Sequence, residues 1–208
     1  MDASPKELPT DPQAIPDHIR GLIFDCDGTI ADTMPLHWQA WIEVAERHGF
    51  RFAERRFYAL AGVPSRDIVR TLNAELGLDL DPLAIARDKE EAYLAKLGQI
   101  GPIERVVGIA RAQHGRRPMA VASGGSRRVI ERVLEHLGIR PLFQAVVTNE
   151  DVVRQKPAPD IFLEAARRLG VRPEYCRAYE DAELGLAAIR AAGMEAVDVR
   201  GFLNAASA

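Results

Sequence analysis

The sequence lacks the features that mark several classes of protein. It has only two cysteines, Cys26 and Cys176, which are too far apart for a metal-binding spacing. Its apolar runs are too short to span a bilayer, and no basic and apolar signal-peptide pattern precedes them. The net charge of −3 creates no field that favours nucleic acid or an anionic membrane. We therefore expect a cytoplasmic monomer or weak dimer with neither of these partners.

The bulk of the chain is suited to a packed core, because 47% of its residues are hydrophobic. Residues 1–18 differ, since four prolines lie among polar residues there, and this composition predicts a flexible N-terminal tail.

Short apolar runs alternate with helical patterns over much of the chain. The runs at 21–25, 119–123, 145–148, 176–180 and 196–199 predict buried strands. Apolar residues recur at helical spacing between them, and Gly138, Gly170 and Gly193 follow three of these helices. This order predicts an α/β fold, with a doubly wound, Rossmann-like parallel sheet covered by helices on both faces. Ligands of such sheets bind at the carboxyl ends of the strands.

One segment interrupts the alternation. Residues 33–104 contain helical patterns only, whereas a crossover between parallel strands needs about a dozen residues. We interpret this segment as an inserted α-helical cap on a catalytic core that comprises residues 19–32 and 105–208.

Polar residues follow four of the predicted strands and should converge on one edge of the sheet. They are Asp25-Cys-Asp-Gly-Thr29, Ser123, Lys156 and Glu180-Asp181. Taken singly, each is more simply a turn, a loop residue or a helix cap. Taken together at successive strand ends, they predict a phosphoryl-transfer site.

Each of these residue types has a task in phosphoryl transfer. A phosphate monoester is a dianion, so an attacking carboxylate such as Asp25 needs a cation beside it, and Mg²⁺ binds carboxylate oxygens. We expect Asp25 and Asp181 to be its ligands, with Glu180 supporting its waters. Attack by Asp25 would give an aspartyl-phosphate. Asp27 would serve as general acid and then as general base.

The remaining groups would bind the phosphoryl oxygens. The ammonium of Lys156 would neutralise one of them and keep Asp25 ionised. The Ser123 hydroxyl and the backbone N–H groups of Gly28, Thr29 and Gly124 would hold the others. The predicted substrate is thus a small phosphorylated metabolite.

This set of residues resembles the four motifs of the haloacid dehalogenase-like hydrolases, and the resemblance extends from about Gly21 to Arg200. It implies the roles given above for Asp25, Asp27, Lys156 and Asp181. It further implies that Asp27 offers its backbone carbonyl to the metal.

The position of the cap resembles that of the β-phosphoglucomutase-like branch, in which Asp32-Thr33 and His37 match the pattern after the nucleophile. Residues 114–120 and 191–200 resemble bacterial phosphatases that act on fructose 1-phosphate and similar sugar phosphates. The resemblance implies that His37 can contact the substrate, and Arg66, a cation at the edge of the turn formed by residues 62–66, is a second candidate contact. Pro64 displaces Arg66 by one position from the mutase pattern, and the residues after Ser123 also differ, which favours hydrolysis.

Three alternatives remain open from the sequence. A phosphosugar mutase of the β-phosphoglucomutase type would use the same aspartyl-phosphate. A 2-haloacid dehalogenase is disfavoured because its chemistry needs neither Asp27 nor Mg²⁺. A non-catalytic binding module on the same scaffold is disfavoured because no catalytic group is missing.

Overall fold

Five short apolar segments form one parallel sheet in the computed structural model, which describes residues 14–203. The strands lie side by side in the order β5-β4-β1-β6-β7, and every neighbouring pair is parallel. The central strands β1 and β4 are buried along their whole length, as their unbroken apolar runs predicted. The bounds are β1 (Gly21–Phe24), β4 (Met119–Ala122), β5 (Ala145–Val147), β6 (Cys176–Glu180) and β7 (Glu195–Asp198).

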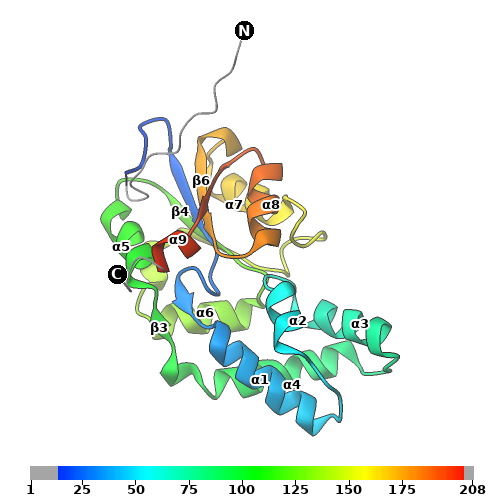
Figure 1. Cartoon of the computed structure of the whole chain (residues 1–208). Helices are drawn as coiled ribbons and strands as arrows, with labels where there is room; N and C mark the ends of the chain where they lie inside the picture. The colour runs from blue at the N-terminus through cyan, green and yellow to red at the C-terminus, as the bar shows by residue number, and fades with distance from the viewer. Residues whose placement is uncertain (1–13, 204–208) are drawn as a thin grey trace.

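Helices cover both faces of this sheet (Figure 1). Leu22 and Phe24 of β1 face a cluster with residues of α5 (Glu104–Gln113) and α6 (Arg127–His136). Ile23, which points the other way, packs with residues of α7 (Asp160–Leu169) and α8 (Glu183–Ala191). The fold predicted from the sequence is therefore confirmed. Shorter segments complete this part: η2 (Arg140–Leu142), η3 (Pro173–Tyr175) and α9 (Arg200–Leu203).

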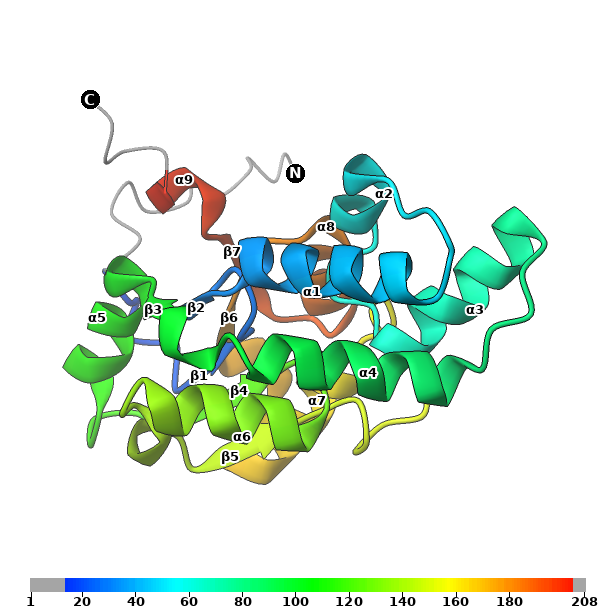
Figure 2. The ribbon, with the colours of Figure 1, turned by 90° about the horizontal axis from the view of Figure 1, so that it is seen from below.

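The helical insertion forms a layer beside the carboxyl edge of the sheet (Figures 1 and 2). Within it, α4 packs against both α1 and α3. Two strands of two residues each, β2 and β3, pair antiparallel where the chain leaves the core and returns to it. Segments this short have no periodicity, so the sequence did not predict them. The bounds are β2 (Ala31–Asp32), α1 (Met34–Arg47), α2 (Glu54–Ala59), α3 (Ser65–Leu76), α4 (Pro82–Leu94), η1 (Leu97–Gln99) and β3 (Gly101–Pro102).

Local sequence signals set the ends of these helices. α3 ends at Gly77, whose φ of 65° is the left-handed conformation that glycine adopts without strain. α4 begins after Asp81, whose carboxylate accepts hydrogen bonds from the backbone N–H groups of Leu83 at 2.9 Å and Ala84 at 3.2 Å. These two caps fix the end of α3 and the start of α4.

The predicted N-terminal tail lies partly outside the described residues, which begin at residue 14. From there the chain contacts the core: the Ala14 carbonyl accepts a hydrogen bond from the buried Arg177 at 3.0 Å. Among residues 14–203, no helix combines the length and the apolar character that crossing a membrane requires.

Candidate active site

The polar residues that follow the strands lie together at the carboxyl edge of the sheet. Asp25 follows β1, the central strand, and Ser123 follows the neighbouring β4. Glu180 is the last residue of β6 on the other side, and Lys156 comes from the loop between β5 and α7. Parallel strands direct all their following residues to this one edge, which explains why residues so distant in the chain meet.

A buried ion triad forms the centre of the site. The Lys156 ammonium donates hydrogen bonds to Asp25 Oδ1 and to Glu180 Oε2, both at 2.7 Å. None of these three side chains is more than 6% exposed. Burial, followed by the charge of Glu180, raises the pKa of Asp25 to about 7, while Lys156 opposes this rise. Burial alone would lower the pKa of Lys156, but the two carboxylates raise it, so this side chain remains an ammonium.

Glu180 and Asp181 have different surroundings. Glu180 Oε1 accepts the backbone N–H groups of Asp181 at 3.2 Å and Ala182 at 3.0 Å, and Lys156 occupies Oε2. Asp181 accepts a hydrogen bond from the Thr29 hydroxyl at 3.2 Å. Burial and then the charge of Asp25 raise the pKa of Asp181 to about 6. Glu180 is thus largely saturated by protein donors, whereas Asp181 keeps acceptor capacity.

Asp25, Glu180 and Asp181 together fit a hard divalent cation. One oxygen from each of these carboxyl groups lies within 4.8 Å of the other two. The ammonium of Lys156 contacts Asp25 and Glu180, whereas Asp181 accepts a hydrogen bond from the neutral Thr29 hydroxyl. Burial and then the neighbouring carboxylates raise the pKa values of Asp25 and Asp181, so a further cation would stabilise their charged forms. An all-oxygen ligand set with excess negative charge suits Mg²⁺.

Asp27 is the end of a hydrogen-bonded chain that comes from the cap. Its Oδ1 accepts a hydrogen bond from the Thr33 hydroxyl at 2.8 Å and lies 2.9 Å from His37 Nε2. His37 Nδ1 in turn lies 2.6 Å from the ammonium of Lys89 on α4, and the His37 ring stacks on Tyr93 with the ring centroids 3.9 Å apart. An ammonium that donates to Nδ1 leaves the proton of a neutral imidazole on Nε2, from which it is donated to Asp27.

The pKa values of these hydrogen-bonded residues agree with a neutral His37 that donates to a charged Asp27. Burial and the charge of Lys89 lower the pKa of His37, which keeps its ring neutral. Burial alone would raise the pKa of Asp27, but His37, followed by the hydrogen bond from Thr33, lowers it to about 2. Burial lowers the pKa of Lys89 to about 8. Asp27 is therefore a carboxylate at neutral pH in this arrangement, the form that accepts a proton.

Of the predicted phosphate-binding residues, Ser123 and Gly124 line the same space as Asp25 and Asp27. The backbone N–H groups of Gly28 and Thr29 instead donate to the carbonyls of Ala31 at 2.9 Å and Cys26 at 3.3 Å. The Ser123 hydroxyl lies 3.5 Å from Asp27 Oδ2 and accepts a hydrogen bond from the N–H of Gly125 at 3.0 Å. Gly28 has a φ of 82°, and a Cβ there would overlap the carboxylate of Asp181. A Cβ on Gly124 would overlap the carbonyl oxygen of Gly62 in the cap. Two glycines therefore permit the close approach of loops at the site.

The predicted cap residues have different positions. His37 lines a cavity of about 70 Å³ with Asp25, Asp27, Ser123 and Lys89. Arg66 does not line it: its side chain is 35% exposed and lies 3.9 Å from Asp67. The cap wall of this cavity is mainly apolar, with Met34, Trp41, Phe57, Leu60, Val63 and Ile68.

Sequence reasoning missed three residues around the site. Lys89 was detectable in principle, because a cation on the apolar stripe between Ile85 and Tyr93 of α4 must be buried with a partner. Gly185 packs so closely against Glu180 that a Cβ would overlap its carboxylate. The amide of Asn149 donates to the carbonyl of Gly124 at 2.9 Å. The last two contacts have no sequence signal.

A family profile described as haloacid dehalogenase-like hydrolase matches residues 19–193. The chain belongs to this family. It is 46% identical over 181 residues to the fructose-1-phosphate phosphatase YqaB of Escherichia coli, and the match covers 86% of this chain and 96% of that protein. It is 31% identical to the β-phosphoglucomutase of Bacillus subtilis, over 87% of this chain and 83% of the mutase.

Solved structures agree with this assignment. The β-phosphoglucomutase of Clostridium difficile superposes with a TM-score of 0.76 at 28% identity, over 86% of this chain and 84% of that one. The CbbY protein of Rhodobacter sphaeroides, solved in complex with phosphate, gives the same TM-score at 27% identity, with the same two coverages. The chain is therefore an enzyme, a phosphoric monoester hydrolase of the haloacid dehalogenase-like family.

Proposed function

We propose that this enzyme hydrolyses a small sugar phosphate similar to fructose 1-phosphate, with Asp25 as the nucleophile. The observation that carries this proposal is the position of the Asp25 carboxylate, which lies at the end of the central strand, 2.7 Å from the ammonium of Lys156 and two residues before Asp27. The substrate class is supported by the 46% identity to a fructose-1-phosphate phosphatase.

The first step would transfer the phosphoryl group to the protein. An oxygen of Asp25 attacks phosphorus, and the bond between phosphorus and the sugar oxygen breaks. Asp27 gives the departing alkoxide a proton, so it must enter this step protonated, although its pKa in the free enzyme is about 2. Binding of a phosphate dianion beside Asp27 would raise that pKa. Lys156 and the Ser123 hydroxyl stabilise the charge on the transferring oxygens.

The second step would release inorganic phosphate. Water attacks phosphorus, Asp27 takes the proton from that water, and the bond between phosphorus and Asp25 breaks. This step restores the carboxylate of Asp25. The hydrogen bonds from Thr33 and His37 hold Asp27 in one orientation for both proton transfers.

A Mg²⁺ ion would be held by the carboxylates of Asp25 and Asp181, with the backbone carbonyl of Asp27 as a further ligand and Glu180 supporting its waters. When bound, it would supply the positive charge that lets a carboxylate approach a phosphate dianion. The clustering of the Asp25, Glu180 and Asp181 oxygens supports this assignment.

The cap, residues 33–104, would select the sugar. The side chains that line the cavity, rather than Arg66, which does not line it, are the ones we assign to this role. Because that wall is mainly apolar, with Lys89 already engaged by His37, it suits a substrate that carries a single phosphate group.

A screen of sugar monophosphates tests the proposal. We expect Mg²⁺-dependent release of inorganic phosphate, with the largest kcat/KM for fructose 1-phosphate or a close analogue, and loss of turnover in a chelator. The control is incubation with glucose phosphates, in which a mutase would isomerise the sugar without net release of phosphate. Isomerisation without release, or no hydrolysis of any sugar phosphate, would contradict the proposal.

A further inference from the structure

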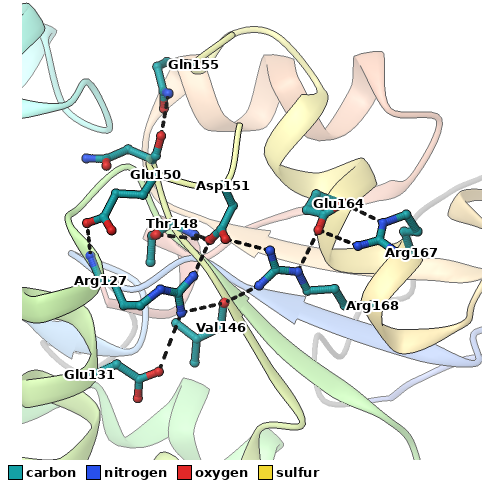
Figure 3. Close-up of polar contacts among 11 residues, drawn as sticks. Arg127, Glu131, Val146, Thr148, Glu150, Asp151, Gln155, Glu164, Arg167 and Arg168 are labelled. Carbon is teal, nitrogen blue, oxygen red and sulfur yellow. Dashed lines mark hydrogen bonds and ion pairs between the residues drawn. The ribbon is translucent and has the colours of Figure 1, made fainter. Parts of the chain in front are cut away.

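Asp151 lies in the loop that brings Lys156 to the active site, at the centre of a polar cluster (Figure 3). Its Oδ2 accepts hydrogen bonds from the backbone N–H of Thr148 at 2.8 Å and from Arg127 Nη2 at 2.5 Å. Its Oδ1 accepts one from Arg168 Nη2 at 2.7 Å. Arg127 begins α6 and Arg168 belongs to α7, so one carboxylate joins the loop to helices on opposite faces of the sheet.

Both arginines are themselves fixed to the sheet. Each guanidinium donates a hydrogen bond to the carbonyl of Val146 in β5, at 3.3 Å from Arg127 and 3.1 Å from Arg168 (Figure 3). Arg168 is held further by Glu164 at 2.7 Å. The Asp151 side chain is only 15% exposed, so water screens its ion pairs weakly. The position of the Asp151 carboxylate is therefore fixed relative to β5.

The loop between β5 and α7 connects Asp151 to the active site through further hydrogen bonds. The Asn149 amide donates to Gly124 beside Ser123, and Lys156 reaches Asp25 and Glu180. Between them, the amide of Gln155 donates to the carbonyls of Asn149 at 3.1 Å and Val152 at 3.2 Å, which closes the loop on itself. A loop closed in this way moves as a unit, so a shift at Asp151 also shifts Lys156.

We propose that Asp151 is a positioning residue for Lys156: by fixing the loop between Arg127 and Arg168, it sets the distance from the Lys156 ammonium to the Asp25 carboxylate. The competing interpretation is an ion-pair cluster that stabilises the fold and has no influence on the active site. The kinetic consequence rests on the proposed phosphatase function, whereas the structural consequence for Lys156 does not.

Turnover of two variants separates these interpretations. Asp151→Asn keeps an acceptor for the Thr148 amide but removes the charge that holds both arginines. We expect kcat to fall roughly 10- to 100-fold with KM little changed, because the displaced group acts on the transferring phosphoryl group. Glu164→Gln is the matched control: it weakens the same cluster, because Glu164 accepts hydrogen bonds from Arg167 and Arg168 on its own helix, α7, rather than from the loop. It should lower kcat much less than Asp151→Asn, because Arg168 keeps its hydrogen bonds to Asp151 and to the carbonyl of Val146.

A labelling experiment reads the position of Lys156 without any substrate. An amine-reactive reagent followed by peptide mass spectrometry should modify Lys156 slowly in the wild type, where the residue is 4% exposed, and clearly faster in Asp151→Asn. Lys96 in the cap is the internal reference, and its rate should stay the same. Both proteins are labelled at a temperature at which circular dichroism shows them folded.

Equal labelling of Lys156 in Asp151→Asn and wild type would overturn the positioning role. An unchanged kcat in Asp151→Asn, or an equal loss in Glu164→Gln, would also overturn it. If the wild type released no phosphate while the labelling changed as expected, the phosphatase proposal would fail and the role of Asp151 would stand.

Discussion

Lys156→Met should show how much the buried ion triad contributes to stability and to catalysis. Methionine has nearly the length of lysine but no charge, so the variant leaves the carboxylates of Asp25 and Glu180, at most 6% exposed, without their common cation. Removing one partner of a buried ion pair typically costs about 3–5 kcal/mol. At about 2–4 °C per kcal/mol for a domain of this size, the midpoint of thermal unfolding should fall by roughly 6–20 °C.

The chain offers a matched control in Lys96→Met. Lys96 forms an ion pair of nearly the same length, 2.8 Å, with Glu43, but the two side chains are 20% and 43% exposed. An exposed pair contributes about 0–1 kcal/mol, so this variant should unfold within a few degrees of the wild type. The substitution and the pair distance match, so the two variants differ in burial and in the number of carboxylates that lose their cation, two for Lys156 and one for Lys96.

The loss in Lys156→Met should also depend on pH. Burial and Glu180 already raise the pKa of Asp25 to about 7, and loss of the ammonium removes the group that opposes this rise. A carboxyl group whose folded-state pKa is raised costs stability above its unfolded value of about 3.9, and the cost is complete above the folded value. Below about pH 7 Asp25 is protonated in both folded proteins, so the deficit of the variant should grow as the pH rises above about 7, toward the higher folded-state pKa of Asp25 in the variant.

Thermal unfolding in metal-free buffer at several pH values measures these stabilities, and phosphate release at saturating substrate measures turnover. We expect kcat to fall by about 10²–10³, the effect of removing one preorganised stabilising group from an active site. Equal stability losses in Lys156→Met and Lys96→Met, or a deficit that does not vary with pH, would refute the reasoning.

Three further predictions concern single residues. Asp25→Asn should abolish turnover yet raise the stability of the metal-free protein at pH 8 by at most about 4 kcal/mol, because the raised pKa of Asp25 indicates that its site favours a neutral group. A variant less stable than the wild type in thermal unfolding at pH 8 would contradict this prediction. Gly185→Ala should lower both stability and kcat, since the overlap of its Cβ with Glu180 outweighs the preference of about 1 kcal/mol for alanine over glycine in a helix. The control Gly108→Ala on α5, where a Cβ meets nothing within 4 Å, should be neutral or stabilising. Burial alone would raise the pKa of Asp151, but Arg168, Thr148 and Arg127 lower it. Asp151 therefore stabilises the fold above its unfolded pKa of about 3.9 and loses this contribution as the pH falls through its folded value. In acid titrations monitored by circular dichroism, the difference in stability between wild type and Asp151→Asn should be full at pH 6 and narrow below pH 4, and a constant difference would exclude this cause.

Much of the fold was predictable because burial leaves a regular trace in the sequence. The strands β1, β4 and β5 are unbroken apolar runs, and helices such as α7 show apolar residues at a spacing of three and four. The paired strands β2 and β3 were not predictable, since two residues each are too few for a pattern and their pairing joins residues some seventy positions apart. Such pairing depends on the path of the chain in space.

The candidate site was predictable to the extent that strand ends determine it. Asp25, Ser123 and Glu180 lie where the strand pattern placed them, because parallel strands share one carboxyl edge. The contact of Gly185 with Glu180, and the hydrogen bonds from Arg127 and Arg168 to Asp151, depend on how helices pack, which no local pattern encodes. Arg66 is half-buried beside Asp67, and this predicted substrate contact lies outside the cavity.

The nucleophilic role of Asp25 is the central claim, and trapping the phosphorylated protein tests it most directly. A rapid acid quench during the first turnover with fructose 1-phosphate and Mg²⁺, followed by peptide mass spectrometry, should find one phosphoryl group on the peptide that contains Asp25. The Asp25→Asn variant should carry none. Release of phosphate in the first turnover with no covalent phosphate at any quench time, or with the phosphoryl group on another residue, would contradict the account.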